Sequence, residues 1–406
     1  LLRVRMGPKL ALATLPFIAG IGLIVQSGIN ASLMDSIGHG ILAACVSFAG
    51  GTLLLFLLYV AQRASEKRKK WATSPVPSRS SADERSEDPP AAPRTPRSGR
   101  PGLRLWHLIG GVIGAVFVTI LTIVSPLIGF AVVFVTLVLG QLTTSLVFDH
   151  VGFAGMPRRP FSKLKAVGAA TLLVGAFLTV VQLLVNNDAD VGTGTAAVLA
   201  LLCAFSGTAA PLQTVINSKV GAAIRSPLGA ALLSFAVGTL VLLLASIVVC
   251  LIDQGVWSGL GDGFQAARWW EYSGGAPGAV YVYLALKLAP TVGIATFFVS
   301  LIAGQLSASL VLDHIGAFGF DKRSASALRV AGVLTAFIGV AIIQYARKHD
   351  AGLARASSFK GASGKLSGPA STVVEMPVKD KTDAMAPGGG ERPRNDDTSD
   401  EEKGET

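Results

Sequence analysis

Charged residues are scarce in this sequence. Asp, Glu, Lys and Arg make up 15% of its 406 residues, whereas hydrophobic residues make up 51%. A soluble protein of this length needs more charge to cover its surface, so a surface that faces lipid is expected. The charge that is present is clustered in residues 63–104, in short connections and in the segment after Tyr345. This distribution indicates a membrane protein.

The sequence also lacks the usual motifs of enzyme and metal sites. Its three cysteines, Cys45, Cys203 and Cys250, all fall in apolar stretches, which argues against a disulfide framework or a metal cluster. It has no phosphate-binding loop, metal-ligand spacing or nucleophile motif, and no expected span has an acidic residue at its middle. These absences disfavour an ATP-driven pump, an enzyme and cation export by carboxylate exchange. No cofactor or metal is expected.

Apolar stretches of about 20 residues, the length that crosses the hydrocarbon core as a helix, recur along the whole chain. Because lipid offers the backbone no hydrogen-bond partners, these stretches are expected to be helices. Neighbouring stretches nearly touch at Pro126 and at Ala289-Pro290. The prediction is an all-α membrane protein with spans near residues 10–33, 40–62, 105–124, 126–148, 164–185, 194–218, 227–252, 273–289, 291–312 and 327–345.

An internal repeat divides these ten spans into two sets of five. Residues 126–155 and 290–319 are identical at sixteen of thirty positions and share the pattern GQLxxSLxxDHxG. The earlier spans match at another constant offset, through QxxxN and SFxxGT motifs. Five is an odd number, so tandem five-helix units enter the membrane with opposite orientations. We therefore predict two inverted repeats, residues 10–185 and 194–345, after a short N-terminal segment, residues 1–9.

The distribution of Lys and Arg predicts the orientation, because these residues are retained on the cytoplasmic side. With the N-terminus inside, the inner segments of the first half hold eighteen basic residues, and the outer connections near 34–39 and 124–126 hold none. Three basic residues of the second half disagree, because this arrangement places them outside: Lys322, Arg323 and Arg329. We expect both termini in the cytoplasm, and residues 63–104 and 346–406 to be a disordered cytoplasmic loop and tail.

The net charge of +10 does not predict nucleic-acid binding, because the basic residues lie in these tethers and not on a folded face. The expected partners are the lipid bilayer, most simply a plasma or bacterial inner membrane, and a small-molecule substrate. The sequence leaves the oligomeric state open. Glycines within the spans, among them Gly110, Gly111, Gly114, Gly168 and Gly175, are expected to let helices pack closely.

Polar side chains within the spans recur at four-residue spacing, which stacks them on one helix face. Because polar groups are costly in lipid, they are expected to face the bundle interior, where amides and hydroxyls suit an uncharged or zwitterionic ligand. Hydrogen bonding between helices is the alternative, and serines also bond back to their own helix. The candidate substrate-binding residues are Gln26, Asn30, Gln141, Ser145, Gln213, Asn217, Gln305 and Ser309.

Two Asp-His pairs, Asp149-His150 and Asp313-His314, lie at corresponding span ends. A carboxylate beside an imidazole relays protons near neutral pH, so coupling or gating is one hypothesis. A polar helix terminus followed by a turn is the other. An Asp at a helix C-terminus is mildly unfavourable, which favours a further use for these carboxylates.

The combination of GQLxxSLxxDHxG, QxxxN and SFxxGT resembles the YdcZ-type branch of the drug/metabolite transporter superfamily. The resemblance covers about residues 10–185 and 195–345, and the chain is similar to a fused pair of five-helix units. It implies a transporter. It also marks the amide, serine, aspartate and histidine positions above as signature positions, without assigning a role to any of them.

We therefore expect a secondary transporter, and not an enzyme, that moves a small uncharged or zwitterionic organic molecule by alternating access. Inverted repeats supply two nearly equivalent packings for such a mechanism. One alternative is a membrane scaffold without transport activity. Another is a lipid-modifying membrane enzyme that uses an Asp-His pair, which is disfavoured because the two pairs are expected on opposite faces of the membrane.

Overall fold

The computed structural model describes residues 8–72, 104–155, 158, 162–186, 191–320, 322–323 and 326–366. Within these residues the chain is helical and contains no strand. The chain divides into two compact units, residues 1–353 and 354–406, and every contact discussed below lies within the first. The all-α fold predicted from the sequence is confirmed.

Five long helices make up the first half, in sequence order: α1 (Pro8–Ile37), α2 (Gly40–Ala72), α3 (Ile109–Ile128), α4 (Phe130–Val151) and α5 (Lys163–Asn186). The second half repeats this order. In it α6 (Thr193–Ser206) and α7 (Ala209–Ile224) together correspond to α1 and are followed by α8 (Pro227–Ile252), α10 (Gly275–Val292), α11 (Ile294–Ile315) and α12 (Ala327–Leu366). Eight stretches of the described residues are long and apolar enough to span a membrane. The remaining two members of the predicted ten are α5 and α10.

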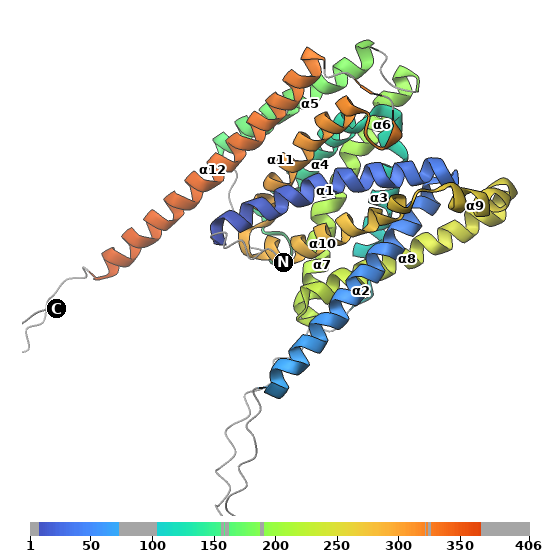
Figure 1. Cartoon of the computed structure of the whole chain (residues 1–406). Helices are drawn as coiled ribbons and strands as arrows, with labels where there is room; N and C mark the ends of the chain where they lie inside the picture. The colour runs from blue at the N-terminus through green and yellow to red at the C-terminus, as the bar shows by residue number, and fades with distance from the viewer. Residues whose placement is uncertain are drawn as a thin grey trace, which may run out of the picture. The chain divides into compact units, whose positions relative to one another are not determined.

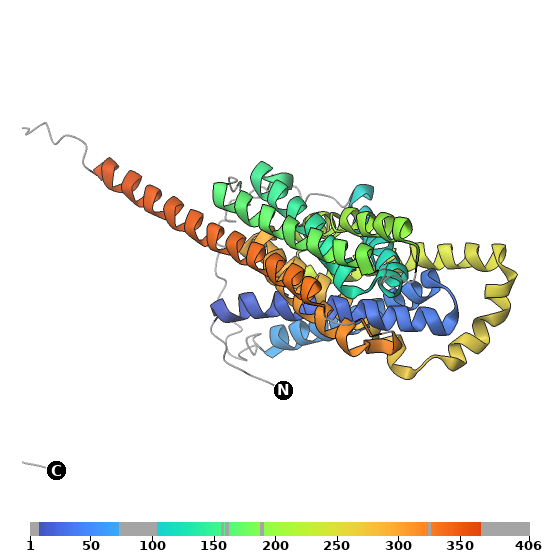
Figure 2. The ribbon, with the colours of Figure 1, turned by 90° about the horizontal axis from the view of Figure 1, so that it is seen from above.

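Short elements precede and follow the third and fourth helices of each half. The 3-10 helices η1 (Leu105–Leu108) and η2 (Phe153–Gly155) belong to the first half, and η3 (Trp269–Gly274) and η4 (Ala317–Gly319) are their counterparts in the second. An additional helix, α9 (Gln254–Ala266), follows α8 at the periphery of the bundle (Figure 2). The hydropathy pattern predicts only a connection between spans here, whereas the structure has a helix of 13 residues.

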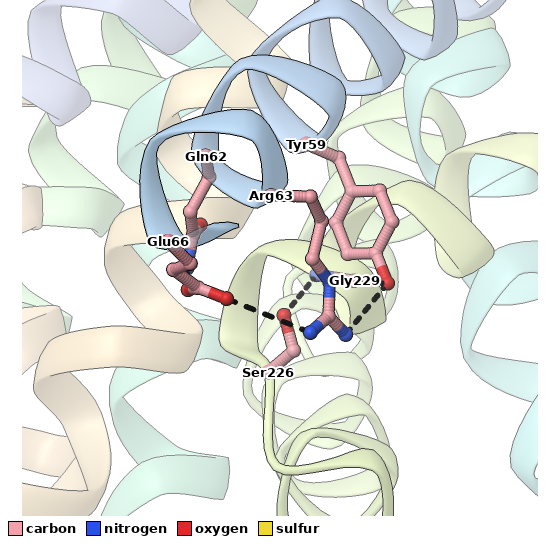
Figure 3. Close-up of polar contacts among 6 residues, drawn as sticks. All are labelled: Tyr59, Gln62, Arg63, Glu66, Ser226 and Gly229. Atoms are coloured by element: carbon pink, nitrogen blue, oxygen red, sulfur yellow. Dashed lines mark hydrogen bonds and ion pairs between the residues drawn. The ribbon is translucent and has the colours of Figure 1, made fainter. Parts of the chain in front are cut away.

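Two helices extend past their expected ends. The second span was expected to end at residue 62, but α2 continues to Ala72. Pairs one turn apart support this extension: Arg63 donates to the Tyr59 hydroxyl at 2.9 Å and lies 3.6 Å from the Glu66 carboxylate (Figure 3). The last helix, α12, likewise runs to Leu366, beyond the residue 346 at which a disordered tail was expected.

Glycine, and not proline, separates the third and fourth helices of each half. Pro126 lies inside the last turn of α3 and Pro290 inside the last turn of α10. The chain breaks three residues later, at Gly129 (φ +83°) and Gly293 (φ +94°). A residue with a Cβ rarely adopts such a φ, so glycine is needed at both breaks. The boundaries expected at the prolines were therefore wrong by a few residues.

The two halves run in opposite directions. Asp313, at the end of α11, accepts hydrogen bonds from the first two backbone amides of α4. The two helices are copies of each other and pack side by side, so one ends where the other begins only if the repeats are inverted. We call this face of the bundle, where α1, α3 and α11 end and α4 begins, the η4 end. The opposite face is the η2 end.

Homologous residues touch each other along the pseudo-two-fold axis that relates the repeats. Phe48 of α2 stacks on its counterpart Phe235 of α8 with ring centroids 4.8 Å apart. The hydroxyls of Thr52 and Thr239, one turn further along, are 2.8 Å apart. Two residues related by a two-fold axis meet only on that axis. The axis therefore passes between α2 and α8.

Three further helix crossings join the two halves through glycines: α1 with α11, α6 with α4, and α5 with α12. A methyl group at Gly20 of α1 would overlap the Leu301 carbonyl of α11, and one at Gly304 would overlap the Phe17 carbonyl. Gly207 and Gly140 form the same crossing between α6 and α4. A third crossing joins α5 to α12, which lie side by side in both views (Figures 1 and 2), through Gly168, Gly175, Gly332 and Gly339. Close helix packing by glycine, as predicted, is confirmed.

Candidate functional site

Gln26 of α1 and Gln213 of α7 line one small cavity on the pseudo-two-fold axis. Its walls include the stacked Phe48 and Phe235 and other homologous pairs, namely Gly114/Gly278, Phe117/Tyr281 and Val118/Val282. The two glutamines are 3% and 6% exposed. The cavity volume is about 20 Å³, and a single water needs roughly 10–15 Å³. The axial cavity is therefore nearly closed in this structure.

Each QxxxN motif packs against a GxxxG motif of the other half. Asn217 and Gln213 lie on Gly110 and Gly114 of α3, where a Cβ would overlap their side-chain amides. Asn30 and Gln26 lie on Gly274 and Gly278 in the same way. Only glycine leaves room for an amide side chain between helices this close. The motifs of the two halves therefore interlock across the axis.

The two asparagines of this arrangement differ in hydrogen bonding. Asn217 donates to the Ser234 hydroxyl at 2.9 Å. The counterparts, Asn30 and Ser47, are 0% and 1% exposed, and neither the Asn30 amide nor the Ser47 hydroxyl has a hydrogen-bond partner among the described residues. An unmade hydrogen bond in a buried position is costly. Equivalent polar groups are thus satisfied in the second half and unsatisfied in the first.

The other candidate residues lie outside the axial cavity. Gln141 and Gln305 are fully buried beside the α4–α6 and α11–α1 crossings, and within the described part of the chain their side-chain amides make no hydrogen bond. Ser145 and Ser309 donate to carbonyls of their own helices, at 2.9 and 3.1 Å. Of the eight predicted residues, Gln26 and Gln213 are the two that line the axial cavity.

Asp313 caps a helix of the other half. Its two carboxylate oxygens accept from the Phe130 amide at 2.9 Å and the Ala131 amide at 2.8 Å, and its exposed fraction is 4%. A carboxylate is stabilising at a helix N-terminus, where unpaired amides and the helix dipole present positive charge. Asp313 is therefore unfavourably placed for its own helix, α11, but favourably placed for the first amides of α4.

The histidine beside each aspartate points elsewhere. His314 and His150 are exposed, whereas Asp313 and Asp149 are buried. Adjacent helical residues project about 100° apart, which separates each carboxylate from the neighbouring imidazole. Asp149 is 6% exposed. The geometry of Asp313 favours a helix-capping role over a proton relay with His314.

Arg323 holds the other side of the same helix break. Its Nη2 donates to the Pro126 carbonyl at 3.1 Å and to the Leu127 carbonyl at 3.4 Å, at the end of α3. A cation is favourable at a helix C-terminus. Asp313 and Arg323 together clasp the α3–α4 break, and we call them the η4 clasp.

Two of the three basic residues that disagree with the charge rule, Arg323 and Arg329, therefore have structural roles, whereas Lys322 is exposed. Arg323 belongs to the η4 clasp, and Arg329 is 1% exposed and donates through Nη1 to the Arg323 carbonyl at 3.5 Å. The rule that orients membrane proteins concerns basic residues in flanking loops. These two arginines serve the packing of the bundle, which weakens the objection they raised to the predicted orientation.

A larger polar pocket opens at the η4 end. Its volume is about 510 Å³, and it is lined by the end of α1, the α3–α4 break, the start of η3 and the segment from α11 to Arg323. Glu271 of η3 lies in its wall and is 3% exposed. Glu271 is not among the residues predicted from the sequence, because it lies between aromatic residues in an expected connection. The repeat aligns it with His107, and this pairing of two ionisable residues is the sequence feature that marks the position.

The described residues contain no group of three or more His, Cys, Asp or Glu side chains able to hold a metal ion. No curated protein matches the chain significantly. A family model described as "Putative inner membrane exporter, YdcZ" matches residues 11–78, 92–178 and 198–342. These matched segments contain the QxxxN, SFxxGT and GQLxxSLxxDHxG motifs of both halves. The chain therefore belongs to the YdcZ family of the drug/metabolite transporters and is a multi-pass membrane protein.

Proposed function

We propose that this protein is a secondary transporter that moves a small organic molecule across the membrane by alternating access. One observation carries the proposal: two copies of the same interlocking motif, related by inversion, are in different hydrogen-bonding arrangements. Asn217 is bonded to Ser234, whereas Asn30 and Ser47 are not bonded to any described residue. Inverted repeats interconvert two such arrangements by exchanging the states of their halves.

The chemistry of the axial cavity supports an uncharged or zwitterionic substrate. Its lining includes the side-chain amides of Gln26 and Gln213, neutral groups that both donate and accept hydrogen bonds. The stacked aromatic rings of Phe48 and Phe235 supply an apolar wall. A site of a few directed polar groups among apolar side chains is typical of small-molecule binding. Because the cavity holds little more than a water here, substrate entry requires the halves to separate.

Replacing both axial glutamines tests this function. Metabolite profiles of cells with and without the protein would identify the transported compound, and Gln26→Leu combined with Gln213→Leu should abolish that difference. The amides are removed while the side chains keep a similar volume, so the protein should still elute as a single species in detergent. Gln344→Leu, at an exposed position on α12, is the matched control and should transport normally. Unchanged transport by the double variant would leave both glutamines as interhelical contacts.

The orientation is part of the proposal. Eighteen basic residues on the inner segments of the first half, and none on its outer connections, support an N-terminus and C-terminus in the cytoplasm. The η4 end then faces outward. In a variant without native cysteines, an impermeant thiol reagent added to intact cells should label Ser258→Cys on α9 and miss Glu66→Cys on α2. Labelling of both, or of Glu66→Cys alone, would reject this orientation.

A further inference from the structure

Glu271 is a buried carboxylate in the wall of the 510 Å³ pocket at the η4 end. Its Oε1 accepts from the Ser32 hydroxyl at 2.8 Å. Its Oε2 accepts from the Ser36 hydroxyl at 2.9 Å and from the Arg268 backbone amide at 3.1 Å. All three donors are neutral groups. They hold the carboxylate in place at the side of the pocket.

No basic side chain of the described residues lies within ion-pair distance of Glu271, since the ion pairs found there are Arg63–Glu66 and Lys165–Asp350. The other buried carboxylate of the pocket, Asp313, is already matched by the α4 amides, with Arg323 beside it at the same helix break. Removing a charge from water is costly unless an opposite charge approaches it. The pocket therefore has a negative site that its own side chains leave uncompensated.

The repeat shows that the fold does not need a carboxylate at this position. The counterpart of Glu271 is His107, which is 8% exposed. Its Nδ1 accepts from the Arg104 backbone amide at 2.8 Å, just as Glu271 accepts from the amide of Arg268, the counterpart of Arg104. An imidazole therefore makes the same local hydrogen bond in the first half. The negative charge at residue 271 serves something other than the turn.

Other charges around the pocket define what fits there. Asp35, beside Ser32 and Ser36 on α1, is exposed and adds a third carboxylate to the pocket lining, after Glu271 and Asp313. Arg268 is exposed and lines the pocket as well. An ammonium group would compensate Glu271, and Asp35 would attract it electrostatically. An anionic group on the same molecule would meet Arg268.

We propose that the pocket at the η4 end binds the ammonium group of a small organic molecule at Glu271, and that an amine-bearing zwitterion fits the pocket best. The binding of an ammonium group at Glu271 does not depend on transport. Only the role of the pocket as the outer entrance to the axial cavity rests on the proposed function. An ammonium site narrows the substrate class from uncharged or zwitterionic molecules to those that carry an amine.

Tryptophan fluorescence of the purified full-length protein tests the proposal, because Trp269 and Trp270 adjoin Glu271 in sequence. The probes are choline and ethanolamine, each paired with its uncharged isostere, 3,3-dimethylbutan-1-ol and propan-1-ol. At least one ammonium probe should bind with a Kd about tenfold below that of its isostere, a preference worth about 1.4 kcal/mol. If neither ammonium probe is preferred over its isostere, the proposal is wrong.

Two variants assign the preference to the carboxylate. Glu271→Gln removes the charge, and Glu271→His installs the residue that caps the same turn in the first half. Both should elute as single species and lose the preference, whereas Glu66→Gln, at an exposed position on α2, should keep it. An equal preference in Glu271→Gln would overturn the proposal. Because binding is measured without transport, a failure of the glutamine test leaves this result unaffected, and the reverse also holds.

Discussion

The two halves place the same QxxxN motif on the same GxxxG motif, but they do not use the polar groups equally. In the second half Asn217 bonds to Ser234, and in the first half Asn30 and Ser47 remain without partners among the described residues. The glycine contacts beneath them are the same in both halves. The backbone is therefore symmetric where the helices touch, and the halves differ in the hydrogen bonds of their side chains.

The two ends of the molecule also differ, in the charge of equivalent positions. Glu271 and Asp35 line the pocket at the η4 end, whereas His107 and Ala222 occupy their positions in the other half of the repeat. An inverted repeat with identical ends would have no preferred direction in its surface chemistry. Under the proposed transport mechanism, the divergence of these few side chains would give each entrance its own ligand preference.

The largest effect is expected where the two halves are most alike. Leu at Gly140 or Gly304 would drive a side chain into a backbone carbonyl, of Ala204 or Phe17, that has no rotamer with which to move away. Each variant should lose more than about 3 kcal/mol, the upper part of the usual range for overpacking, and yield no monodisperse protein by size-exclusion chromatography. Gly259→Leu, where a side chain meets open space, should elute normally. Normal elution of one crossing variant and not the other would show that the crossings are not equivalent.

A smaller effect should separate the two asparagines. Asn217→Ala removes the bond to Ser234 and should cost about 0.6–1.7 kcal/mol, which are the average and the maximum measured for hydrogen bonds between membrane helices. Asn30→Ala removes an amide that makes no such bond, so its cost should be smaller, or the change should stabilise the protein. Unfolding by SDS in mixed micelles compares the two variants. Equal losses would mean that both asparagines are bonded and that the halves do not differ.

The inverted architecture could be predicted from the sequence because the two halves share repeated motifs. A duplicated odd number of spans dictates inversion, and the GQLxxSLxxDHxG pattern pairs Asp149 with Asp313 without any structure. What Asp313 does was beyond that reasoning. Its partners, the amides of Phe130 and Ala131, lie more than 180 residues away and belong to the other half of the chain.

The exact helix ends and the pocket at the η4 end could not be predicted, because they depend on contacts and burial that hydropathy does not report. Hydropathy marks where apolar residues stop, but α2 continues to Ala72 as an exposed helix supported by contacts such as Arg63 to Tyr59. The boundary between the third and fourth helices was predicted at Pro126, because proline usually ends a helix, but the backbone turns at Gly129. Glu271 was passed over because a lone acid in a connection carries no signal until its burial is known.

Replacing one carboxylate by an amide, at Asp313 or at Asp149, should have the smallest effect on stability and gives the most informative comparison between the halves. Asp313→Asn weakens the η4 clasp, because a neutral amide replaces the carboxylate that holds the α4 amides. Opening of the η4 end should then become more frequent. Asp149 is the inverted counterpart of Asp313, and Asp149→Asn should favour opening of the η2 end.

Thiol labelling at two related positions measures this directly. Ser36 and Ala223 are counterparts in the repeat, both half-buried, and each is changed to cysteine in a background without Cys45, Cys203 and Cys250. In Asp313→Asn, Ser36→Cys should label faster and Ala223→Cys more slowly, and Asp149→Asn should reverse both changes. Opposite shifts are what alternating access of two inverted halves predicts. Parallel shifts in the two variants, or no shift in either, would contradict it and leave the aspartates as helix caps alone.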